Sequence, residues 1–162
     1  MKPNTVGRVG GQDPHTGPFS PYAVLDTGLL QGALLLTLDG EMPVEHLVEG
    51  ARVITRDCGM AILRKIETRT SKLTPIRIKA GSLGHTRPDR DMLVSSGARI
   101  HIRDWRAEAL FGQKAASVSA ERLVDGEFLA EQAPREMTTY TLRFDREHII
   151  YADGIEMLSD KI

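Results

Sequence analysis

Residues 32–59 read GALLLTLDGEMPVEHLVEGARVITRDCG. The apolar run Ala33–Leu38 ends at Asp39-Gly40, and the extended run Arg52–Arg56 leads into Asp57-Cys58-Gly59. An apolar run closed by Asp-Gly predicts a strand, and extended runs on both sides of a glycine-containing turn predict a hairpin. This segment therefore predicts β structure with tight turns.

Short apolar runs separated by turn residues continue to the end of the chain and predict a mainly β protein. Further strands are expected over 60–70, 75–79, 92–95, 99–103, 137–144 and, as the last one, 148–152. Helix propensity rises over 105–111, before Gly112, and a second short helical turn is expected over 119–124. Two polar stretches are expected to be loops, 80–91 and 127–136. The fold class is therefore all-β with one or two short helices around 105–124.

Length and composition are those of one globular domain. The chain has 162 residues, of which 41% are hydrophobic and 27% charged, close to the averages for soluble proteins. Its 21 Lys and Arg are balanced by 22 Asp and Glu, so no positive field favours nucleic acid or an anionic membrane surface. The apolar stretch 28–38 is too short to cross a bilayer, and the N-terminus lacks the pattern of a signal peptide. We expect a soluble chain without a nucleic-acid partner, and the compartment stays open.

The first residues differ in composition from the remainder of the chain. Residues 1–27 are rich in Gly, Pro, Ser and Thr, and such a segment buries too little apolar surface to offset the entropy of ordering it. We expect residues 1–27 to form a flexible, turn-rich arm and residues 28–162 to form the β domain.

Three stretches, in order along the chain, carry a resemblance. They are the opening segment 32–59, the central segment 75–95 and the closing segment 144–154, which reads FDREHIIYADG. Together they resemble the bacterial Hedgehog/intein (Hint) domains over residues 28–162. The resemblance implies a horseshoe-shaped all-β fold and an ancestral self-processing chemistry, namely autoproteolysis and protein splicing.

In that chemistry a Cys or Ser at the start of the domain attacks the preceding peptide carbonyl, assisted by a nearby Thr and His. The resemblance assigns the nucleophile position to Gly28 and the central histidine position to Ala98. In the closing strand His148 has exchanged places with Glu147, and of the family's Glu-Ser step only Ser159 is kept. Glycine and alanine carry no group that attacks a carbonyl or transfers a proton. We therefore expect a Hint-like domain that has lost catalysis.

Two other functions remain open from the sequence. The domain would still process itself if Thr27 or Ser159 served as the nucleophile with His148 as its acid and base. Alternatively, the chain is a small β-rich binding module that shares only the architecture. For a domain without catalysis the expected partner is another protein or a polypeptide segment, and the sequence does not predict an oligomeric state.

The polar loop that follows Gly84 offers candidate ligand-binding residues. Basic and acidic side chains alternate there, and loops on a rigid β scaffold often carry function. The candidates are Arg87, Arg90 and Asp91.

The only cysteine, Cys58, lies in the expected hairpin turn. No group adjacent in the sequence would activate its thiol, so we expect an ordinary exposed cysteine whose replacement by serine leaves any activity unchanged. A single cysteine forms neither an internal disulfide nor a Cys-rich zinc site. The histidines lack close metal-binding spacing as well, so no metal and no cofactor is expected. The candidate metal ligands that lack this spacing are His85, His101 and His148 with Asp145 or Glu147.

Overall fold

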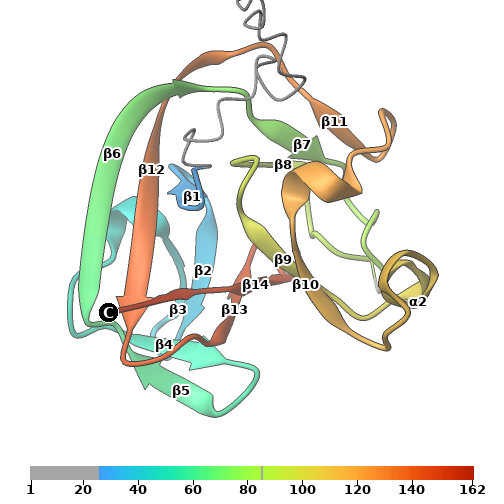
Figure 1. Cartoon of the computed structure of the whole chain (residues 1–162). Helices are drawn as coiled ribbons and strands as arrows, with labels where there is room; N and C mark the ends of the chain where they lie inside the picture. Colours follow the sequence, from blue (N-terminus) through green and yellow to red (C-terminus); the bar gives the residue numbers. More distant parts are fainter. Residues whose placement is uncertain (1–25, 85) are drawn as a thin grey trace, which may run out of the picture.

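The computed structural model describes residues 26–84 and 86–162 as three open sheets with little helix (Figure 1). The longest strands form a curved ribbon along one side of the molecule. In this ribbon β12 (Arg135–Phe144) pairs antiparallel with β6 (Lys65–Leu73) along its length. The short strand β1 (Leu29–Leu30) also pairs antiparallel with β12, and β15 (Asp160–Lys161) pairs parallel with it. The chain's first described strand and its last strand are therefore both attached to β12.

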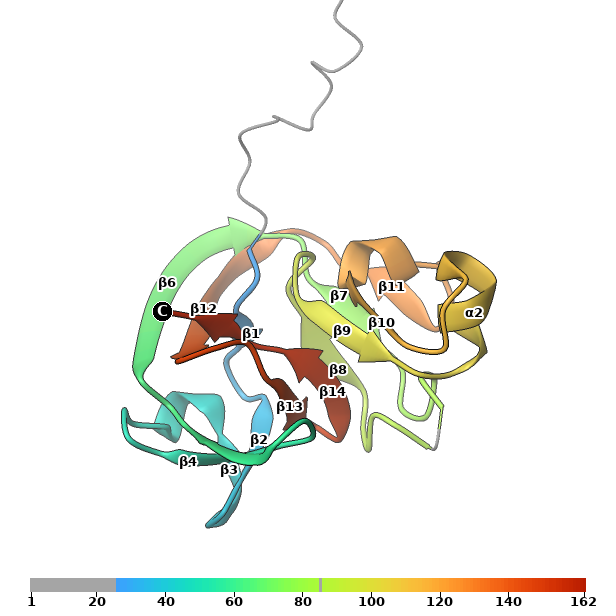
Figure 2. The ribbon, with the colours of Figure 1, turned by 60° about the horizontal axis from the view of Figure 1, so that its bottom comes forward.

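An eight-stranded sheet holds most of the remaining strands, in the order β10-β9-β14-β13-β2-β4-β5 with β3 paired to β2. Figure 2 shows β14 and β13 between β9 and β2. The burial pattern alternates along β2, β9 and β13, as expected for strands with one face on the core. The strands are β2 (Leu34–Thr37), β3 (Gly40–Pro43), β4 (Arg52–Thr55), β5 (Gly59–Ile62), β9 (Arg99–Ile102), β10 (Ala116–Ser119), β13 (Ile149–Ala152) and β14 (Ile155–Leu158).

A third sheet has the order β11-β7-β8, with β7 (Ile76–Ile78), β8 (Met92–Val94) and β11 (Leu129–Glu131). The α-helix α2 (Trp105–Phe111) begins after Asp104, whose side chain accepts the Arg106 N–H, and it ends at Gly112 in the left-handed region. Within the described residues there are also two 3₁₀ turns, η2 (Val44–His46) and η3 (Ala120–Leu123).

The three sheets share one hydrophobic core. Its fully buried side chains come from each sheet and from the segment between β5 and β6, so the core holds the open sheets together. Burying a side chain of this size contributes about 1.5–3 kcal/mol. The largest of these residues are Phe144, Leu35, Leu63, Ile76 and Leu129.

The structure confirms the all-β class, the helix over 105–111 and the hairpin turn before Gly59, which has φ +91°. The strand expected over 60–70 is instead divided into β5 and β6. At the division, the Leu63 N–H donates to the Ala51 carbonyl, whereas the Arg64 N–H donates to the Arg143 carbonyl. The chain thus passes from one sheet to another at this point, and a uniform sequence pattern does not mark such a change.

Two further expectations were wrong in the C-terminal half. The stretch 127–136, expected to be a loop, contains β11 and the start of β12, because Leu129 pairs with Ile78 in a non-local contact. The strands also continue beyond 152. Asp153 and Gly154 have φ +50° and +85°, which form a tight two-residue hairpin turn into β14. The arm expected over 1–27 lies outside the described residues as far as residue 25, so its boundary stays a prediction.

Candidate functional site

The segment around Gly28, which the resemblance assigns to the nucleophile position, is held by the turn between β8 and β9. The Ser95 hydroxyl donates to the Gly28 carbonyl at 2.7 Å, and the Gly97 N–H donates to the Asp26 carbonyl at 3.0 Å. Ser95 is fully buried. Immediately afterwards Leu29 enters its pairing with β12. Residues 26–30 are therefore bound on two sides by backbone and side-chain hydrogen bonds.

Gly28 has no space for a side chain. A Cβ atom added at this position would lie 2.9 Å from the Thr139 Cβ atom and 3.1 Å from the backbone carbon and nitrogen of Tyr140. Ordinary carbon contacts are about 3.5–4.0 Å. At Gly28, two strands therefore approach each other closely and leave no pocket.

Ala98 is fully buried in the same turn. Its N–H donates to the Ser95 carbonyl, and its own carbonyl accepts the Ala120 N–H. The position assigned to the central histidine therefore contributes backbone hydrogen bonds and a methyl group, and it offers no group for proton transfer.

Thr27 and Ser159 lie together at a small cavity of about 20 Å³. Thr27 is exposed. The Ser159 hydroxyl accepts the backbone N–H of His148 at 2.9 Å, and the Ser159 N–H donates back to the His148 carbonyl at 2.8 Å. The backbone of His148 is therefore adjacent to Ser159.

The imidazole of His148, in contrast, contacts the turn between β4 and β5. Its Nδ1 atom lies 2.8 Å from Asp57 Oδ2 and 3.6 Å from Cys58 Sγ, and its ring packs edge-on against Phe144. Burial raises the pKa of Asp57, but the hydrogen bonds from the Ile149 N–H and from His148 outweigh this, so the pKa lies below its ordinary value. The sequence does not reveal this cluster, because Cys58 and His148 are 90 residues apart.

The three candidate ligand-binding residues take part in separate interactions. Arg87 pairs with Asp89, and Arg90 donates to Asp153 Oδ1 at 2.9 Å. Asp91 accepts the N–H of Ala80 at 2.8 Å. Of the three candidates, Arg87 lines a cavity of about 490 Å³, whereas Arg90 and Asp91 line a second one of about 200 Å³.

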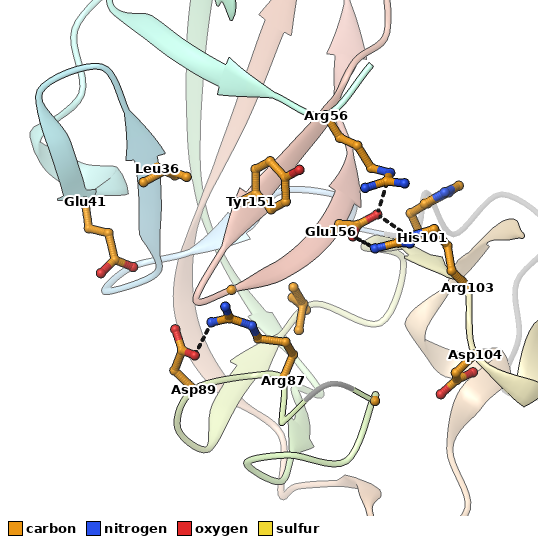
Figure 3. A pocket seen from close by; sticks show the side chains of 13 residues that line it. Leu36, Glu41, Arg56, Arg87, Asp89, His101, Arg103, Asp104, Tyr151 and Glu156 are labelled. Carbon is orange, nitrogen blue, oxygen red and sulfur yellow. Dashed lines mark hydrogen bonds and ion pairs between the residues drawn. The ribbon is translucent and has the colours of Figure 1, made fainter. Parts of the chain in front are cut away.

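The cavity beside Arg87 carries both signs of charge (Figure 3). Arg103 and Arg56 approach the Glu156 carboxylate to 2.6 and 3.4 Å. Burial is the main cause that lowers the pKa of His101 on this wall, although the Glu156 carboxylate opposes it. Because the guanidinium groups of Arg56, Arg87 and Arg103 all have carboxylate partners, the cavity is polar without being an open anion site.

The metal-ligand set considered from the sequence is not assembled among the described residues. His101 bonds Ser117 Oγ at 2.9 Å, Asp145 pairs with Arg64, and Glu147 pairs with Arg99. His85 lies outside the described residues.

Open sheets around one core, with residues 26–30 held beside the turn between β8 and β9, define a class of small all-β domains. The sequence profile of the Hint domain family matches residues 27–159, so this chain belongs to the Hint domain family. No curated protein matches the chain. The described residues also include no helix whose length and apolar character would suit a membrane crossing.

Solved structures of inteins and intein-like domains share the fold. The solution structure of a bacterial intein-like domain from Clostridium thermocellum is 13% identical, with 83% of this chain and 99% of that chain covered and a TM-score of 0.55. A splice-inactive variant of the AceL NrdHF class 3 split intein is 12% identical, with 83% and 98% covered and a TM-score of 0.54. The MchDnaB-1 intein is 9% identical, with 82% and 99% covered and a TM-score of 0.53. At such identities the likeness concerns the fold alone.

Proposed function

We propose that this chain is a Hint domain that does not process itself and acts as a folded binding module. The observation that carries the proposal is the packing at Gly28, where an added Cβ atom would lie 2.9 Å from Thr139. An acyl shift needs a nucleophile on the first residue of the domain and a group that moves protons beside it. Gly28 and Ala98 supply neither.

The other candidate residues do not compensate in this geometry. His148 is the proposed acid and base for Thr27 or Ser159, but its Nδ1 atom is hydrogen-bonded to Asp57. Ser159 Oγ already accepts the His148 backbone N–H. The His148 imidazole, which would accept the proton of either hydroxyl, is therefore directed toward the turn between β4 and β5.

One contact favours an active domain as the second candidate function. The Asp26 carbonyl accepts the Gly97 N–H at 3.0 Å, and a backbone donor of this kind would stabilise an oxyanion if the exposed Thr27 hydroxyl attacked that carbonyl. This route would give an ester between Asp26 and Thr27, with the amide nitrogen of Thr27 released as an amine.

Hydroxylamine and dithiothreitol distinguish the two candidates, because they cleave esters and thioesters but leave ordinary peptide bonds intact. The purified full chain is incubated with each reagent, and its intact mass is followed beside an active intein. We expect one unchanged mass. Cleavage between residues 26 and 28 would contradict the proposal, and its loss in Thr27→Ala but not Ser159→Ala would establish the second candidate.

The proposed partner of this module is another polypeptide. The formal charge of −1 provides no field for phosphate groups, and a split intein is among the similar structures. Arg87, at the 490 Å³ cavity, remains our proposed contact residue for a polar ligand, with Arg90 and Asp91 beside the neighbouring cavity. The family match removes the alternative of a likeness in architecture alone.

A further inference from the structure

Three side chains that bind transition metals converge where the turn between β4 and β5 meets the start of β13. They are Asp57, Cys58 and His148, and one ligand atom of each lies within 4.8 Å of the other two. We propose that these residues form a site for a divalent transition-metal ion, with zinc the ion that best suits the ligands. A thiolate, an imidazole nitrogen and a carboxylate oxygen are all zinc ligands.

One of the distances matches tetrahedral coordination, and a second would need a small adjustment. With Zn–S of about 2.3 Å and Zn–N of about 2.0–2.1 Å, a tetrahedral angle separates sulfur and nitrogen by about 3.6 Å. The distance from Cys58 Sγ to His148 Nδ1 is 3.6 Å. The distance from Nδ1 to Asp57 Oδ2 is 2.8 Å and would open by about 0.5 Å to meet the same geometry. Asp57 lies in an exposed turn, where its side chain has space for this change.

The same distances do not suit a nucleophilic triad. In such a triad the carboxylate and the nucleophile contact opposite nitrogens of the histidine ring. Here Asp57 and Cys58 both face Nδ1 of His148. The three groups thus point to a common centre, which is the arrangement that a bound cation requires.

Metal binding requires a defined protonation state of each ligand. The Cys58 thiol loses its proton to solvent and binds as a thiolate. The neutral His148 ring carries its proton on Nε2, so that the Nδ1 lone pair binds the ion, and Asp57 binds as the carboxylate.

Hydrogen bonds around the cluster hold the ligands in position. Asp57 Oδ1 accepts the Ile149 N–H at 3.0 Å and leaves Oδ2 for the ion. The Thr55 hydroxyl lies 3.4 Å from Cys58 Sγ, where it can donate to a thiolate. Phe144 packs against the His148 ring, which is buried. Such outer contacts orient metal ligands and raise the affinity of a site.

The site is open on one side. Cys58 is exposed, and a cavity of about 390 Å³ borders Cys58 and His148. Three protein ligands with an accessible fourth position leave room for water or for a side chain of a partner. The guanidinium of Arg146 lies 3.9 Å from Asp57 Oδ2, but this side chain is 67% exposed and free to swing into solvent.

Cobalt(II) absorption tests the site directly. Cys58 is the only cysteine of the chain, so any cobalt–thiolate charge-transfer band reports this residue. The metal-stripped full chain is titrated with Co²⁺, and the complex is then challenged with Zn²⁺. We expect a band that saturates at one equivalent, is accompanied by tetrahedral ligand-field bands and disappears when zinc replaces cobalt.

Substitutions distinguish Co²⁺ binding by the three-residue cluster from Co²⁺ binding by the Cys58 thiol alone. We expect Cys58→Ser to abolish the band, and Asp57→Asn and His148→Gln to weaken Co²⁺ binding by about 100-fold or more, because even outer-shell changes cost about 10–100-fold. The exposed His46 provides the control His46→Gln, which should bind as the parent does. Circular dichroism checks that each variant folds. If His148→Gln unfolds, Asp57→Asn still tests the proposal, because Asp57 lies in the exposed turn. No band at tenfold excess Co²⁺, or a band that Asp57→Asn leaves unchanged, would overturn the proposal.

Discussion

Substitution of Gly28 is the most informative perturbation of this fold. Gly28 is not in the left-handed region, so any cost of Gly28→Ala arises from the contact and not from backbone strain. The added Cβ atom would lie 2.9 Å from Thr139 Cβ, about 0.6 Å inside an ordinary carbon contact. Thr139 is 2% exposed, and Tyr140 pairs with both Leu29 and Thr68, so neither neighbour has room to move.

Overpacking of a close contact costs about 1–3 kcal/mol. We expect Gly28→Ala to lower the free energy of unfolding by this amount in urea denaturation with an unchanged slope, and Gly28→Cys to lower it at least as much without restoring cleavage. In a Thr139→Gly background the cost of Gly28→Ala should fall, because one of the close contacts is gone. A Gly28→Ala protein as stable as the parent, or a Gly28→Cys protein that cleaves itself, would refute the reasoning.

Three further predictions concern hydrogen bonds and ion pairs that hold turns and loops of the fold. Ser95→Ala leaves the buried Gly28 carbonyl without its donor and should cost about 1–3 kcal/mol in urea denaturation; an unchanged midpoint would contradict this. Arg90→Ala removes the cation from Asp153, whose side chain is 3% exposed, and should lower the thermal midpoint; equal midpoints would show that the pair does not stabilise the fold. Burial raises the pKa of Asp125, but N–H groups of residues 127–129 lower it below its ordinary 3.8. The carboxylate therefore stabilises the fold above that pH, and the stability difference from Asp125→Asn should shrink from about pH 5 to about pH 3; a difference that grows would have the wrong sign.

The sequence predicted the parts of the fold that depend on local pattern. The helix over 105–111 follows from its propensity and the Gly112 stop, and the alternation over 137–144 marks β12. The sequence did not predict where a strand changes partner. The separation of β5 from β6 and the existence of β11 both depend on pairings with strands far along the chain.

The candidate site shows the same limit. The sequence alone shows that Gly28 and Ala98 lack functional groups. It does not show that Gly28 has no space for a side chain, because the contacting atoms belong to β12. Likewise, Cys58 meets His148 only because β4 and β13 pair at Thr55 and Ile150. Its interpretation as an ordinary turn cysteine rested on sequence neighbours, which do not include the histidine.

If this domain does not process itself, the peptide bonds around Gly28 are structural and not scissile. The most direct test of this claim fuses a reporter domain upstream of residue 1 and measures the released fraction over several days at neutral pH, with an active intein in parallel. We predict that the reporter stays attached to this domain, whereas the active intein releases the reporter fused to it. Release of the reporter by cleavage between residues 26 and 28 would contradict the account.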